Sequence, residues 1–337
     1  MDISKQFNKI TIESLNRNFT FIDAFNTVTS SQHRHLGIQD IDSTLFNEKG
    51  VVVGDIIELI GKSGSGKSIL LKEIIIRTII PTKLYWQQDI LLNGYDSKAF
   101  YFDGDLCFDI LFFYDKICQY LVRYLENKGY KINTQNENLN QEPWIPLKLI
   151  QDTAKNSLKN LFIYSPTSFY DLTDTLAHFS SAYNFSNQQN QELPATNIIV
   201  IDSITQYYWG TKFGVREIAK NQYYLAQLEF VAILKACLKD LNAFSIITSW
   251  AYLYNKTMTE NSSNLGLLRD ESNLSDNEIN SSVLNDALNY RLLLNPRLAN
   301  DTNADVTPRE SINEDEIDIK VVHPDKFNGT SVQYKLW

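Results

Sequence analysis

The sequence has few cysteines and histidines, and neither type occurs at a spacing typical of a metal site. Its 337 residues include three cysteines and four histidines. The cysteines, Cys107, Cys118 and Cys237, lie in apolar runs without a Cys-x-x-Cys pair, so we expect buried free thiols in a reducing compartment. His33 and His35 lie two residues apart in a polar stretch, which favours a surface loop over a zinc site.

Long apolar runs and an excess of positive charge are also missing. No uninterrupted apolar run reaches the ~18–20 residues that a membrane span requires. The first residues carry Asp2, Lys5 and Lys9 without a compact apolar stretch, which argues against a secretory signal. The net charge of −9 argues against a broad cationic surface that grips DNA unaided. We therefore expect a soluble, intracellular protein that makes no contact with a membrane.

The chain does contain a regular alternation of strand and helix patterns. Short apolar, β-branched or aromatic runs predict strands, and longer segments with apolar residues three and four positions apart predict helices. Such alternation is typical of βαβ units and a mostly parallel central sheet covered by helices. We predict strands at residues 56–60, 99–102, 161–164, 198–202 and 244–248, and helices at residues 68–80, 108–125, 171–183 and 215–241.

Composition divides the chain into a lead-in and a core. Residues 1–50 form an N-terminal segment, mixed and mostly polar, and residues 51–337 form the α/β core. Three further strands, expected at residues 290–294, 318–322 and 331–336, follow one another without helices, which predicts an antiparallel extension at one sheet edge. The core is interrupted by polar insertions near residues 130–145, 184–195, 255–285 and 298–316.

A glycine-rich loop follows the first core strand and matches the phosphate-binding pattern G-x-x-x-x-G-K-[ST] in full. Glycines let successive backbone N–H groups point at phosphate oxygens, and the positive end of the following helix dipole lies at the same place. A strand before the loop and a helix after it are the context that the pattern requires. The residues expected to bind the cofactor are Gly61, Lys62, Ser63, Gly64, Ser65, Gly66, Lys67 and Ser68.

These residues predict that the chain binds ATP with Mg²⁺. Lys67 is expected to reach the β- and γ-phosphates, and the Ser68 hydroxyl to hold the metal. Asp202 ends an apolar strand, where a carboxylate lies at the ligand crevice of a parallel sheet, so we predict that it acts on Mg²⁺ partly through water. The alternative for Asp202 is the N-cap of the next helix.

Three segments resemble the RecA-type recombinases, and specifically the eukaryotic recombinase paralogues of homologous recombination. Residues 54–61, GDIIELIG, resemble the family's entry into its phosphate loop. Residues 199–204, IVIDSI, resemble its metal-binding strand, and residues 244–248, FSIIT, its next strand. The likeness covers residues 36–337 and implies a RecA-like P-loop NTPase core with a C-terminal antiparallel β extension.

The resemblance also implies a role. A recombinase paralogue is expected to work in the nucleus, in DNA repair by homologous recombination, as an ATP-binding adaptor or mediator that assists recombinase filaments. Its partners are then other recombinase paralogues or the recombinase itself, with DNA contacted mainly through the complex. The alternative within the same class is an autonomous DNA-stimulated ATPase.

Two departures from the family's pattern bear on hydrolysis. The recombinases place a catalytic Glu after their second core strand, and here Asp105 takes its place. Asp is one methylene shorter, and a base misplaced by about 1 Å costs on the order of 100-fold in rate. Trp250 stands where the family has a nucleotide-sensing Gln, and its ring N–H cannot accept a hydrogen bond. We therefore expect weak ATP hydrolysis or none.

The family's DNA loops and its docking tag map onto weaker patterns. The first loop would contain Lys212 and Arg216, preceded by aromatic residues that either stack on bases or pack in the core. The second, residues 251–289, carries four acidic residues between positions 270 and 278, a poor surface for phosphates. Phe21 and Ala24 fit the Phe-x-x-Ala pattern by which recombinase protomers dock, and the alternative is a segment that packs on its own domain.

Overall fold

The structure is a computed structural model that describes residues 33–46, 50–86, 88–133, 144–187, 196–207, 219–250, 282–298, 312–323 and 330–335. Arg34–Trp337 forms one compact unit. The first described strand begins at His33, one residue before this unit. The elements in chain order are β1 (His33–Arg34), α3 (Gln39–Leu45), β2 (Val51–Val52), β3 (Ile56–Gly61), α4 (Lys67–Ile79), β4 (Lys83–Trp86), β5 (Gln88–Leu91), β6 (Ala99–Asp103), α5 (Ile110–Asn127), β7 (Lys131–Asn133), β8 (Trp144–Pro146), α6 (Leu147–Ser157), the 3-10 helix η1 (Leu158–Asn160), β9 (Leu161–Tyr164), α7 (Phe169–Asn187), β10 (Asn197–Asp202), α9 (Ala219–Asp240), β11 (Ala243–Trp250), α10 (Ser282–Ala287), β12 (Tyr290–Leu298), β13 (Ile312–His323) and β14 (Ser331–Lys335).

An eight-stranded sheet runs through this unit in the order β14-β13-β12-β3-β11-β10-β6-β9. The six strands from β12 to β9 pair in parallel, whereas β13 pairs antiparallel with both β12 and β14. The predicted mostly parallel α/β sheet and its antiparallel C-terminal extension are therefore confirmed. The extension begins one strand later than expected, because β12 lies parallel to β3, with Tyr290 opposite Ile57.

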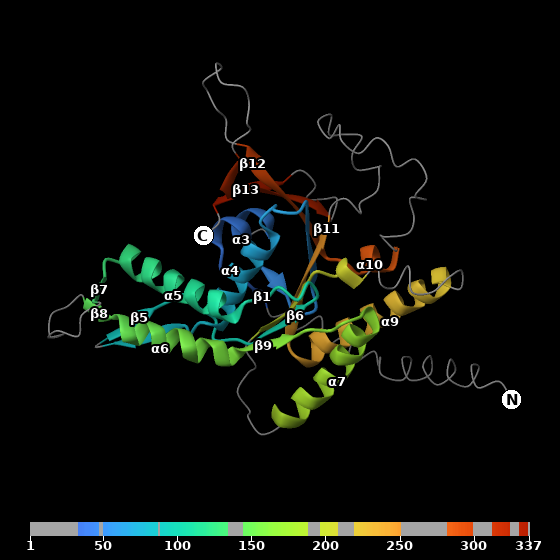
Figure 1. Cartoon of the computed structure of the whole chain (residues 1–337), viewed down its shortest axis with the longest axis horizontal. Coiled ribbons are helices and arrows are strands. Elements are labelled where there is room, and N and C mark those ends of the chain that lie inside the picture. The colour runs from blue at the N-terminus through green and yellow to red at the C-terminus, as the bar shows by residue number, and fades with distance from the viewer. Residues whose placement is uncertain are drawn as a thin grey trace, which may run out of the picture. The chain divides into compact units, whose positions relative to one another are not determined.

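Helices cover both faces of the sheet, and the strand sequences dictate which side chain meets which layer. Successive residues of a strand point to opposite faces. Tyr101 and Val200 accordingly pack in the core beneath α4 and α5, whereas Phe100 and Ile201 pack in the second core against α7 and α9. Figure 1 shows α4, α5 and α6 on one side of the strands, and α7 and α9 on the other. Continuous apolar runs in the central strands are thus explained by burial on both faces.

Some elements were not predicted. A two-stranded hairpin, β4–β5, follows α4, and α6 lies before β9. The insertion expected near residues 130–145 carries β7 and β8 at its two ends, which pair in parallel. The cysteines are free, as predicted, but only Cys237 is buried; Cys107 is exposed, because it lies in the loop between β6 and α5.

Candidate functional site

The loop of residues 61–68 lies between β3 and α4, as its sequence predicts. Gly64 and Gly66 have φ angles of 75° and 85°, the left-handed region that glycine adopts without strain. Gly61 is required for a different reason: a Cβ there would lie 2.7 Å from the backbone oxygen of Leu294 on β12. The loop therefore packs directly against the neighbouring strand at Gly61, and a side chain at Gly61 would push it out of place.

Lys67, the first residue of α4, folds back over the loop. Its Nζ donates to the backbone oxygens of Gly61 at 2.9 Å and Lys62 at 2.8 Å, and lies 3.5 Å from Ser65 Oγ. The side chain is buried, and burial lowers the pKa of its ammonium group, an effect that Asp202 and Asp105 oppose. A cation held at the centre of a glycine-rich loop is placed to meet an anion that the loop surrounds.

The start of α4 differs from the start of α5. No side chain among the residues that the structure describes caps α4 at Gly66, whereas Asp109 Oδ1 accepts from two backbone N–H groups at the start of α5. The first N–H groups of a helix have no acceptor within the helix. Those of α4 thus remain directed at the loop, which is the arrangement that binds phosphate. Ser68 lies in this first turn with an exposed side chain.

Asp202 ends β10 at the same edge of the sheet, and two neighbouring strands hold its carboxylate. The Tyr101 hydroxyl on β6 donates to Oδ2 at 2.8 Å, and Thr248 Oγ1 on β11 donates to Oδ1 at 2.5 Å. All three side chains are buried. Burial and the negative charge of Asp202 raise the pKa of Tyr101 far above its ordinary range, so the phenol keeps its proton and donates. Among the described residues, the Asp202 carboxylate accepts no hydrogen bond from a helix N-terminus, which the N-cap alternative would require.

Asp105 lies near Asp202 and Tyr101, in the loop after β6. Its Oδ1 is buried and has no hydrogen-bond partner among the described residues. Burial, together with the charges of Asp202 and Asp103, raises the pKa of the Asp105 carboxyl group, and Lys67 opposes the rise. Lys67, Asp202 and Asp105 therefore lie within electrostatic reach of one another. Gly104 makes this approach possible, because a Cβ there would lie 2.8 Å from the backbone oxygen of Ser203.

Asp103 has a structural role. Its two carboxylate oxygens accept from the backbone N–H groups of Cys107 at 3.2 Å and Phe108 at 2.9 Å, which fixes the loop that carries Asp105. Trp250, at the end of β11, lies opposite Gly61 in the register with β3. The loop of residues 61–68, Trp250, Asp202 and the loop that carries Asp105 thus lie at the carboxyl ends of four adjacent strands, which is where ligands bind in open parallel sheets.

Several predicted residues fall elsewhere. Lys212, Arg216, Phe21 and Ala24 lie outside the described residues. Tyr207, one of the aromatic side chains before the first predicted DNA loop, is buried, and its hydroxyl donates to the backbone oxygen of Pro166 at 3.2 Å. Tyr207 therefore packs in the core, as the alternative interpretation had it.

The partners of Asp202 were missed by sequence analysis. Tyr101 and Thr248 each stand in an apolar strand, one residue among bulky neighbours, and only the strand order shows that both flank β10. Their polar atoms at the carboxyl ends of buried strands were the available signal.

No cluster of three or more His, Cys, Asp or Glu side chains is arranged to hold a metal in the described part of the chain.

Comparisons with known proteins leave the site to be judged on its own geometry. No protein-family model matches the chain, and a search of curated proteins found no match. Within the described ranges, no helix combines the length and the apolar character that crossing a membrane requires.

Proposed function

We propose that the chain binds ATP with Mg²⁺ through the loop of residues 61–68, with Ser68 and Asp202 on the metal. The observation that carries this proposal is the position of Lys67, whose Nζ lies within 3 Å of two backbone oxygens of the loop, at 2.9 and 2.8 Å. ATP supplies a polyphosphate that the N–H groups at the start of α4 and the Lys67 ammonium group can share. Ser68, exposed in the first turn of α4, offers its hydroxyl to the metal.

The residues present fit a hydrated magnesium ion better than a directly coordinated one. Both oxygens of Asp202 already accept hydrogen bonds, from Tyr101 and Thr248. Each carboxylate oxygen has a second lone-pair direction, so it can accept from a metal-bound water without losing these bonds. Mg²⁺ usually keeps several of its waters and takes one or two protein ligands together with phosphate oxygens. Asp202 would then orient the hydrated metal, and Ser68 would be its direct protein ligand.

We further propose that the chain is a RecA-like recombinase paralogue and acts as an adaptor in homologous recombination. The support comes from the resemblance of residues 54–61 and 199–204, and from a parallel sheet that places both segments at one edge. The net charge of −9 favours a subunit that meets DNA through its partners over one that grips DNA alone. The partners are other paralogues or the recombinase, and the compartment is the nucleus.

One observation favours the alternative, an autonomous DNA-stimulated ATPase. Asp105 presents a buried, unpartnered carboxylate oxygen beside Lys67, and its pKa is raised. A raised pKa brings a carboxylate toward the range in which it can accept a proton from an attacking water. The shorter Asp side chain is the reason that we propose slow turnover, since general-base catalysis depends on hydrogen-bond reach.

Steady-state ATP hydrolysis, measured with and without single-stranded DNA, separates the two proposals. The adaptor proposal expects slow turnover that DNA changes by less than about twofold, with Asp105→Glu faster than the natural chain because it restores the longer side chain. Turnover that rises about tenfold or more with DNA would instead establish the autonomous ATPase. Asp105→Asn is the control, since an amide cannot act as the base.

A further inference from the structure

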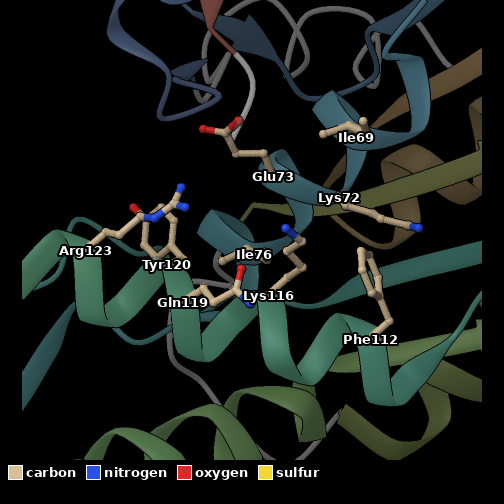
Figure 2. Close-up of a pocket in the computed structure, with 9 residues that line it drawn as sticks. All are labelled: Ile69, Lys72, Glu73, Ile76, Phe112, Lys116, Gln119, Tyr120 and Arg123. Carbon is tan, nitrogen blue, oxygen red and sulfur yellow. The ribbon is translucent and has the colours of Figure 1, made fainter. Parts of the chain in front are cut away.

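A pocket of about 140 Å³ lies between the outer faces of α4 and α5 (Figure 2). Its wall is mostly apolar, formed by Ile69 and Ile76 on α4 and by Phe112 and Tyr120 on α5. Ile69 and Phe112 are 47% and 48% exposed, although both are large apolar side chains. An apolar protein cavity of about 150 Å³ is large enough to hold benzene. The pocket therefore suits one aromatic or branched aliphatic side chain.

Three cations surround this apolar wall. Lys72 of α4 and Lys116 and Arg123 of α5 all line the pocket, and none has a hydrogen bond or ion pair with another described residue. The ammonium groups of Lys72 and Lys116 each lie 5.4 Å from the ring centroid of Phe112. Figure 2 shows Arg123 at one end of the pocket and Phe112 with Lys72 at the other. Positive charge thus brackets the apolar wall at both ends.

The acidic side chain that lines the pocket does not neutralise these cations. Glu73 is buried, and its Oε1 accepts from Arg77 at 3.1 Å and from the hydroxyl of Tyr334. Burial raises the pKa of the Glu73 carboxyl group, which Arg77 and Tyr334 oppose. Oε1 of Glu73 is therefore held by Arg77 and β14, whereas Oε2 is buried without a hydrogen-bond partner among the described residues. In a chain of net charge −9, three cations around one pocket are a local reversal of sign.

We propose that this pocket docks an acidic peptide segment of a partner protein through one large apolar side chain. The anchor would fill the space beside Phe112, Ile69 and Ile76, and carboxylates on either side of it would meet Lys72, Lys116 and Arg123. Buried aromatic anchors surrounded by complementary charge are the usual centre of a specific interface. This inference does not rest on nucleotide binding, since the lining residues of α4 lie beyond the loop of residues 61–68.

An anionic membrane is the other surface that apolar and cationic side chains could meet. An interfacial helix lies on a membrane with its apolar face free. The apolar face of α5 is occupied instead, because Phe113, Ile117 and Leu121 are buried in the core under the sheet. The first turn of α5 also exposes Ile110 and Leu111. The pocket itself is concave and holds one side chain, and a peptide fits this shape.

The test is fluorescence anisotropy of a labelled acidic peptide that has one central Phe flanked by Asp and Glu. We expect saturable binding that weakens as salt rises, as charge pairs at a surface require. Phe112→Ala and the double variant Lys72→Glu/Lys116→Glu should each weaken binding about tenfold or more. Lys159→Glu, an exposed lysine at η1 outside the pocket, is the matched control and should bind as the natural chain does.

Two further peptides measure the separate contributions of the central Phe and of the flanking acidic residues. Replacing the central Phe with Ala should remove saturable binding, and replacing the flanking acids with Ser should weaken it and remove its salt dependence. Phe112 is half exposed, so thermal unfolding should show that Phe112→Ala remains folded. Lys67→Ala should bind the peptide normally, so failure of docking and failure of nucleotide binding are separate results.

The proposal is overturned if the peptide shows no saturable binding, or if the pocket variants bind it as well as Lys159→Glu does. It is also overturned if vesicles rich in phosphatidylserine bind the chain through Lys72 and Lys116 while the peptide does not.

Discussion

The hydroxyl of Tyr101 on β6 donates a hydrogen bond of 2.8 Å to Oδ2 of Asp202 on β10. The Thr248 hydroxyl on β11 donates a hydrogen bond to the other carboxylate oxygen of Asp202, Oδ1. Strands on both sides of β10 thus fix the Asp202 carboxylate at the carboxyl edge of the sheet. A metal-orienting carboxylate acts through its position, so the two donors are as much part of the proposed site as Asp202 itself.

Tyr101→Phe should lower the free energy of unfolding by about 2 kcal/mol, because a buried carboxylate loses one of its donors. We also expect weaker dependence of nucleotide binding on Mg²⁺, since Asp202 is less firmly oriented. Urea unfolding and magnesium titrations measure the two effects. Tyr85→Phe, a phenol that is 75% exposed, is the matched control and should change neither. A Tyr101→Phe variant as stable as the control would show that the hydrogen bond contributes nothing.

A buried ion pair joins β3 to β12. Arg291 Nε lies 2.5 Å from Glu58 Oε2, and Ser249 on β11 donates to the other oxygen of Glu58. Arg291→Met should cost about 3–5 kcal/mol of stability, because it leaves a buried carboxylate without its cation. Breaking the exposed pair of Lys83 and Asp89 by Lys83→Met should cost less than about 1 kcal/mol.

The double variant Glu58→Leu/Arg291→Met tests the reason for that cost. Since it leaves no uncompensated charge, it should recover most of the stability lost in Arg291→Met. Urea unfolding of the natural chain, of Arg291→Met and of the double variant gives the comparison. A double variant that is less stable than Arg291→Met would mean that packing, and not charge burial, dominates at this position.

Gly61→Ala should destabilise the chain by about 1–3 kcal/mol and weaken nucleotide binding, because the new Cβ has no room. It would lie 2.3 Å from Ser65 Oγ and 2.7 Å from the backbone oxygen of Leu294. The double variant Gly61→Ala/Ser65→Ala separates these contacts. It removes the Ser65 hydroxyl but leaves the backbone of β12 in place, so it should remain less stable than the natural chain. Full recovery of stability would show that the new Cβ clashes with Ser65 alone.

Asp105→Asn should be more stable than the natural chain at neutral pH. The pKa of Asp105 is raised in the folded chain above its ordinary value of 3.8, chiefly by burial. The folded state therefore holds the proton more tightly, and ionisation costs stability as the pH rises through the folded pKa. Asn cannot ionise, so the gain should shrink from neutral pH toward about pH 4, as urea unfolding can measure. A variant less stable at neutral pH would contradict this account.

Local sequence patterns predicted the parts of the fold that depend on local chemistry. The strand–loop–helix around Lys67 and the apolar strand before Asp202 were visible because their residue types and spacing identify them. The α6 helix was missed because it is half polar and follows a polar insertion. The pairing of Glu58 with Arg291 joins residues 233 positions apart, and the contacts of Asp202 depend on strand order. A local pattern can mark a polar residue in a buried strand, as it does at Tyr101 and Thr248, but it cannot show which distant residue is the partner.

The central claim is that residues 61–68 hold a nucleotide, and isothermal titration of MgATP into the chain tests it most directly. The natural chain should bind, whereas Lys67→Ala should bind at least about 100-fold more weakly, because the substitution removes the ammonium group that donates to two backbone oxygens of the loop. Lys159→Ala, an exposed lysine away from the loop, should bind as the natural chain does. Equal binding of MgATP by Lys67→Ala and the natural chain would contradict the assignment.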